Sequence, residues 1–161
     1  MALRVAGDAD PAERAVVSAL RAGRTAALAY ADCGTYGALD ELCARYGVRR
    51  LPGLHCYDVF AGPSRIEAVL SRDPGTYLLT DFLLRSFDRS VLAELGLDRY
   101  PELWDDYFGH YTRLVWLAQE PQGASPALEA GADRVAGMFG LPLTRVDVGV
   151  SRLEQALGEI L

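Results

Sequence analysis

The sequence predicts an α/β fold, organised as a single domain over residues 1–161 with an open, mostly parallel sheet and helices on both of its faces. Two observations carry this prediction. Strand-like apolar runs alternate with helical patterns almost throughout the chain, which is typical of a parallel sheet with helical crossovers. The chain has 161 residues, 50% of them hydrophobic, and this is enough for one compact domain with a sizeable core.

Five segments have the composition of strands. Most are nearly continuous in apolar or small residues, as expected of strands covered on both faces, and the last alternates in part. The second segment is the weakest, because two arginines and Pro52 interrupt it and favour an edge position. The expected strands are residues 25–31, 48–54, 76–80, 113–118 and 143–150.

Helical patterns fill most of the chain between these strands. Proline in the first turn, N-capping side chains and glycine after the last turn mark their ends. Thr80 or Asp81 is expected to cap the helix after the third strand, and Gly62 with Pro63 is expected to end a short helix. The expected helices begin near Pro11 and Ser151 and cover residues 38–46, 57–62, 82–87, 90–96, 101–111 and 126–139.

Composition excludes several classes of function. The formal net charge of −6 disfavours nucleic-acid binding, because proteins that bind the phosphate backbone usually present a basic surface. All 16 basic residues are arginine, so a phosphate-loop lysine and a Schiff-base lysine are both excluded. Asparagine is also absent, which excludes a Cys-His-Asn triad, and neither the dinucleotide fingerprint GxGxxG nor a Walker loop occurs.

The sequence also favours a cytoplasmic protein that does not cross a membrane. No apolar run approaches the roughly 20 residues that a membrane-spanning helix needs. The first residues carry acids where a secretory signal would be apolar. Three cysteines are an odd number, so we expect reduced thiols rather than a disulfide framework.

The stretch from Tyr30 to Gly62 contains all three cysteines and one of the two histidines. Cys33 follows the first expected strand, and His55 with Cys56 follows the second. Open α/β sheets place ligands at the carboxyl ends of their strands. Two thiolates and one imidazole suit a transition metal, with zinc as the first choice and a fourth position left for a ligand or substrate. The leading hypothesis is therefore a metal-binding α/β protein, an enzyme or a metallocofactor-handling protein, with Cys33, His55 and Cys56 as ligands.

This hypothesis depends on the backbone at His55 and Cys56. Neighbouring residues on an extended strand point to opposite faces, so both can bind one metal ion only if the strand has already ended. Gly53 makes an early end of the strand possible.

A metal-free enzyme with a single reactive cysteine is the second hypothesis. Cys33 is the first candidate for the nucleophile, because Gly34 lets a ligand approach the backbone closely and the helix that follows offers amides to an anion. Cys56 can serve in the same way after the second strand. Cys43 lies within a helical pattern and is expected to be a core residue.

Other polar residues near the expected strand ends are candidates for supporting roles. Asp32, Asp58 and Asp81 can orient an imidazole, act as a base or form hydrogen bonds with the residues that bind a metal. Thr76, Tyr77 and Thr80 can contact a ligand through their hydroxyl groups, and Arg85 can pair with an anionic substrate. His110 is expected to be structural.

A third hypothesis is a noncatalytic subunit that binds a small molecule or a partner protein. Trp104, Tyr107 and Phe108 share one face of an expected helix, and their exposure as a patch would favour this hypothesis.

Three short segments stand out in the chain: YADCG at residues 30–34, LPGLHC at residues 51–56 and PGTYLL at residues 74–79. These segments resemble a bacterial and archaeal family of uncharacterised proteins that is often encoded near corrinoid-dependent methyltransferases. The chain departs from the family pattern at Ala31 and at the adjacent pair His55 and Cys56. The resemblance implies an α/β protein with a Cys/His/Cys site for a metal, a corrinoid or another metallocofactor, and it implies no particular reaction.

Overall fold

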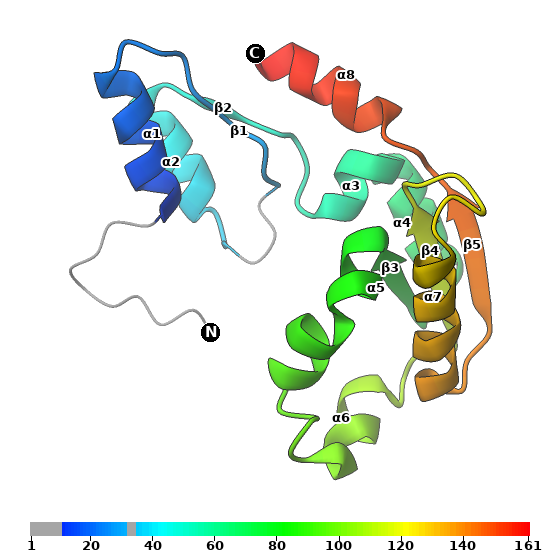
Figure 1. Ribbon diagram of the computed structural model, residues 1–161. Coiled ribbons are helices and arrows are strands. Elements are labelled where there is room, and N and C mark those ends of the chain that lie inside the picture. Colours follow the sequence, from blue (N-terminus) through cyan, green and yellow to red (C-terminus); the bar gives the residue numbers. More distant parts are fainter. Residues whose placement is uncertain (1–10, 32–34) are drawn as a thin grey trace. The chain divides into compact units, whose positions relative to one another are not determined.

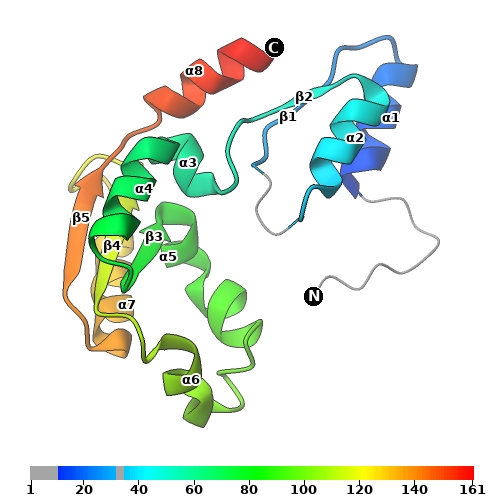
Figure 2. The ribbon, with the colours of Figure 1, turned by 180° about the vertical axis from the view of Figure 1, so that it is seen from behind.

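The computed structural model in Figures 1 and 2 describes residues 11–31 and 35–161. Its helices and parallel strands confirm the α/β class. The described strands form two sheets, one of two strands and one of three, and all of their pairings are parallel. The chain divides into two compact units, which take their residues from Met1–Val59 with Leu153–Leu161 and from Phe60–Arg152.

The first unit contains the two-stranded sheet. Strand β1 (Ala27–Leu28) pairs with β2 (Arg49–Arg50), and the amide of Leu51 adds a further hydrogen bond of 3.0 Å to the Leu28 carbonyl. Both strands are shorter than the sequence predicts. Pro52, which has no N–H group, and Gly53, with φ of 109°, end the extended backbone directly after Leu51.

Helices α1 (Pro11–Arg21) and α2 (Ala38–Tyr46) lie side by side in this unit (Figure 1). Val16, Leu42 and Val48 form their common core. The α2 bounds are those that the sequence predicts, and Gly47 ends the helix in the left-handed conformation with φ of 63°.

A second cluster of the first unit joins the segments that follow β1 and β2. Ala31, Leu51 and Val59 are buried together, and Val59 belongs to α3 (Cys56–Ala61). Apolar side chains of α8 (Ser151–Ile160) pack against this cluster: Leu153, Ala156, Leu157 and Ile160. The segment after β1 and the segment after β2 therefore both contribute residues to the same small core.

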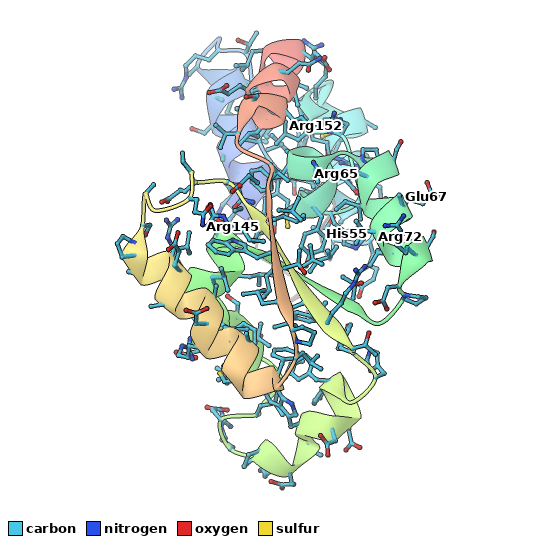
Figure 3. All side chains as sticks on the ribbon, turned by 90° about the vertical axis from the view of Figure 1, so that its right-hand side faces the viewer. His55, Arg65, Glu67, Arg72, Arg145 and Arg152 are labelled. Carbon is cyan, nitrogen blue, oxygen red and sulfur yellow. The ribbon has the colours of Figure 1, made fainter. Side chains whose placement is uncertain are left out.

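The second unit is built on the three-stranded sheet. Strand β4 (Arg113–Ala118) lies between β3 (Thr76–Thr80) and β5 (Leu143–Asp147), and each pairing is parallel. Helices α4 (Pro63–Arg72) and α7 (Pro126–Phe139) lie on opposite sides of this sheet (Figures 2 and 3). The sheet of this unit thus has helices on both faces.

The remaining helical elements of the second unit are short. They are α5 (Asp81–Phe87), a π-helical turn (Asp88–Ala93), a 3₁₀ turn (Pro101–Leu103) and α6 (Trp104–Phe108). The sequence prediction lacks helix α4, because it assigns Gly62 and Pro63 to the end of a helix. Proline is equally suited to the first position of a helix, and Pro63 begins α4. No described helix has the length and apolar character that are needed to span a bilayer.

The main core of the second unit lies between its sheet and the helices α5 and α7. Leu79 and Leu114 come from the sheet, and Phe87 and Val135 come from the two helices; all four are buried. Tyr77 packs at the edge of this core, with its ring centroid 5.0 Å from that of Tyr111 and 5.1 Å from that of Phe139. Burial, with a smaller contribution from Tyr111, raises the pKa of Tyr77 to about 12.

The raised pKa of Tyr77 predicts a loss of stability at alkaline pH. An unfolded chain releases the Tyr77 proton near pH 10, whereas the folded chain keeps it until about pH 12. The stabilising effect is therefore complete below pH 10 and is lost between pH 10 and 12, by about 2–3 kcal/mol in the free energy of unfolding. Because the chain has no lysine, only tyrosine and cysteine side chains titrate in this range.

Urea unfolding of the wild type and of Tyr77→Phe from pH 9 to 12 tests this expectation. The phenylalanine variant should lose less stability than the wild type across this range, while Tyr100→Phe, at an exposed tyrosine, should behave like the wild type. An identical alkaline slope in Tyr77→Phe and wild type would contradict the assignment.

Candidate functional site

The segment that carries His55 and Cys56 begins where β2 ends. The backbone bends over residues 52–55, and helix α3 starts at Cys56. The two residues therefore lie at the entrance to a helix and not on a continuing strand. The alternation of an extended strand, which would direct His55 and Cys56 to opposite faces, does not apply to them.

The His55 side chain is exposed, and its ring stacks on that of Tyr57 with a centroid distance of 6.1 Å and an interplanar angle of 12°. Cys56 is a thiol and is partly buried at the first position of α3. An exposed imidazole and a partly buried thiol at adjacent positions of the chain are two of the side-chain types that bind zinc.

Asp58 holds this segment in place. Its Oδ2 atom accepts hydrogen bonds from the backbone amides of Leu54 and His55, at 2.9 Å and 3.1 Å. This is the half of a capping box in which the third helical residue reaches back to the amides before the helix. A Cβ atom at Gly53 would lie 2.8 Å from the Asp58 Cβ, so glycine also gives Asp58 the room that it needs.

The described residues exclude Asp32, Cys33 and Gly34. Of the three predicted metal ligands, the structure therefore describes His55 and Cys56. In residues 11–31 and 35–161, no three or more His, Cys, Asp or Glu side chains are grouped closely enough to hold a metal ion. A three-ligand site in the first unit therefore requires at least one ligand from outside the described residues, and Cys33 is the candidate that the sequence offers.

Asp81 belongs to the second unit and is 3% exposed. Its Oδ1 atom accepts a hydrogen bond of 2.7 Å from the Trp116 indole, and its Oδ2 atom accepts from the amides of Gln119 and Glu120 at 3.2 Å and 2.9 Å. The Asp81 amide donates in turn to Gln119 Oε1 at 2.9 Å. These bonds explain why the carboxylate is buried, and they join the start of α5 to the loop after β4.

The three hydroxyl residues that the sequence assigns to ligand binding lie along β3. Thr80 caps α5, because its hydroxyl accepts from the Leu83 amide at 3.3 Å. Thr76 is 4% exposed and bonds to the Asp73 carbonyl and to the Arg113 guanidinium, both at 2.7 Å. Thr76 and Tyr77 are at the amino end of the strand and Thr80 is at its carboxyl end, so they do not line one edge of the sheet.

The remaining candidates have structural surroundings. Cys43 packs against the core of α1 and α2, and burial raises the pKa of its thiol. Arg85 forms an ion pair with Glu120. The His110 ring is exposed and lies 4.1 Å from that of Tyr111.

The aromatic residues of α6 do not form an exposed patch. Phe108 is 6% exposed, and Trp104 packs against the main core of the second unit. Only Tyr107 of the three extends to the surface, at 41% exposed. The hypothesis of a partner-binding aromatic face loses its support.

The model of the family described as "Protein of unknown function (DUF1638)" matches residues 13–157. The chain belongs to this family. No curated protein and no solved structure matches the chain. The family has no assigned function, so membership in it does not identify a reaction.

Sequence reasoning missed the partner of Asp81. Trp116 lies 35 residues away in the chain, and only the fold brings its indole to the carboxylate. A signal was present, because a tryptophan within an otherwise aliphatic strand usually needs a partner for its N–H group. The Arg145 guanidinium covers the same indole, 4.3 Å from the ring centroid.

The buried hydrogen bonds of Asp81 predict a large effect on stability. Asp81→Asn presents an NH₂ group to donors that need an acceptor, and we expect the free energy of unfolding to fall by about 2–3 kcal/mol. Trp116→Phe removes one donor and should cost less than Asp81→Asn. Asp88→Asn is the control at an exposed ion pair, with an expected change below about 0.5 kcal/mol. Denaturant unfolding measures all three, and equal values for Asp81→Asn and Asp88→Asn would refute the structural role.

Proposed function

We propose that the first unit binds a transition-metal ion, with zinc as the best match, through Cys33, His55 and Cys56. The observation that carries the proposal is the parallel pairing of β1 with β2, followed by an immediate end of both strands. Parallel neighbours leave a sheet at the same edge. The residues that follow β1 and those that follow β2 therefore begin at adjacent places.

The small core after these strands supports the proposal further. Ala31 is packed in one cluster with Leu51 and Val59, and Val59 lies three residues after Cys56. Cys33 follows Ala31 by two residues, so covalent geometry keeps the two Cα atoms within about 7 Å of each other. The three proposed ligands are thus tied by short lengths of chain to one packed cluster.

The chemistry of the three side chains suits zinc. Thiolate and imidazole are its preferred ligands, and a site with three protein ligands leaves a fourth position for water or substrate. A bound zinc ion would supply a Lewis acid or an activated water at that position. In this arrangement His55 and Cys56 act as ligands, Asp58 fixes the backbone that carries them, and Asp32 is placed by sequence beside Cys33 as a proton acceptor.

Metal content tests the proposal directly. The protein is purified under anaerobic conditions and analysed for metal, and zinc is added back to metal-free samples. We expect one zinc ion per chain in the wild type, and at least tenfold weaker binding in Cys33→Ser, His55→Ala and Cys56→Ser, because each variant removes one ligand.

The chain supplies matched controls for this experiment. Cys43→Ser and His110→Gln change the third cysteine and the second histidine and should bind zinc like the wild type. Wild type without stoichiometric metal after zinc addition would rule out the proposal. An absorption spectrum of the purified protein reports whether a corrinoid is bound in place of zinc.

A metal-free thiol enzyme is the second candidate. The observation that favours it is the partly accessible Cys56 thiol next to the exposed His55. It predicts one cysteine that alkylates much faster than the other two near neutral pH in metal-free protein. Three uniformly slow thiols would remove this candidate.

A further inference from the structure

The side chain of Arg50, the last residue of β2, donates hydrogen bonds both to α2 and to the bend after β2. Its Nε and Nη2 atoms donate to the two carboxylate oxygens of Asp40, at 2.6 Å and 2.9 Å. The side chain of Arg50 is only 13% exposed, whereas that of Asp40 is 59% exposed. This bidentate pair fixes the plane of the guanidinium against α2.

The third nitrogen of Arg50 points to the segment that carries His55. Nη1 donates to the carbonyl of Leu51 at 2.8 Å and to that of Gly53 at 3.0 Å. These two carbonyls belong to the bend after β2. Arg50 therefore connects the start of α2 with the backbone that leads to His55 and Cys56.

Arg50 and Asp58 together hold both kinds of backbone group in this bend. Asp58 accepts from the amides of Leu54 and His55, while Arg50 donates to the carbonyls of Leu51 and Gly53. A bend that is fixed by one cation and one anion keeps its geometry before a ligand arrives.

We propose that Arg50 is a positioning residue for the proposed metal site, and that it acts by fixing the backbone before His55 and Cys56 through the carbonyls of Leu51 and Gly53. The inference rests on the proposed zinc binding. Loss of the guanidinium would leave the bend to be ordered when the metal binds, and this ordering lowers affinity. Mutation of a residue that orients metal ligands through hydrogen bonds typically lowers metal affinity by about 10- to 100-fold.

The geometry requires arginine at this position. A planar guanidinium can bind both oxygens of Asp40 and still direct a third nitrogen to two carbonyls, whereas a lysine ammonium is a single point charge. Hydrogen bonding to Arg50 also lowers the pKa of Asp40, which agrees with an ion pair between the two side chains.

The test measures the zinc affinity of the full chain by competition with a chromophoric chelator. We expect the zinc dissociation constant to rise about 10- to 100-fold in Arg50→Gln. Arg50→Lys should show a loss of similar size, because the charge remains and the fork is lost. Asp40→Asn, which weakens only the support of the guanidinium, should show a smaller loss. Arg45→Gln is the control, because Arg45 lies in the last turn of α2 and pairs with Glu13 of α1 at 3.0 Å.

Amide hydrogen exchange in the metal-free protein measures how well the bend before His55 and Cys56 is ordered. The Leu54 and His55 amides should exchange faster in Arg50→Gln than in wild type, while amides of β4 in the second unit should keep their rates. If Arg50→Gln unfolds the first unit, exchange will accelerate throughout that unit, including α2. In that case Asp40→Asn, the milder variant, is used for the same comparison of zinc affinity and amide exchange.

The outcomes separate the two proposals. If wild type binds zinc and Arg50→Gln binds it equally well, the positioning role is wrong and the metal site stands. If wild type binds no zinc, both proposals fall. Full affinity in Arg50→Lys would show that charge alone is required, which also overturns the positioning role.

Discussion

The parallel pairing of β1 with β2 is the constraint on which the first unit depends. The ladder is only two residues long in each strand, yet it fixes the direction in which both segments leave the sheet. Because those segments converge on the cluster of Ala31, Leu51 and Val59, apolar packing begins where hydrogen bonding between the strands stops. Short strands can persist here because the helices and this cluster bury the apolar side chains around them.

The bend after β2 has no regular partner for its backbone groups, and charged side chains take over that role. Arg50 and Asp58 bind carbonyls and amides that would otherwise face water or remain unsatisfied. In the second unit Asp81 has a related task, since one buried carboxylate joins the start of α5 to the loop after β4. Both units thus use acidic or basic side chains to fix irregular backbone at the ends of their strands.

The elements with strong local signals were predictable from the sequence. Strands β3 and β4 and helices α2 and α7 have the predicted bounds, because apolar continuity, proline at the start and glycine at the end act within a few residues. Helix α4 was missed because a Gly-Pro pair marks a stop and a start equally well. The lengths of β1 and β2 were overestimated, since pairing depends on the partner strand and not on composition alone.

The candidate site was predictable only in part. The sequence pattern predicts His55 and Cys56 after a strand, and the geometry of a strand requires that it end before them if both are to be ligands. It could not distinguish an acid that binds a ligand from one that holds backbone, because the partners of Asp81 and Arg50 are brought close only by the fold.

The contact between Gly53 and Asp58 has a consequence for how this protein can vary. Any side chain at position 53 would meet the Asp58 Cβ at 2.8 Å and would also have to adopt a φ of 109°, which L-residues rarely tolerate. A substitution there would displace the carboxylate and release two amides at once. Natural variation and laboratory selection are therefore expected to keep Gly53 and Asp58 together, while this contact lets the residues at positions 54 and 55 vary as long as their backbone amides remain.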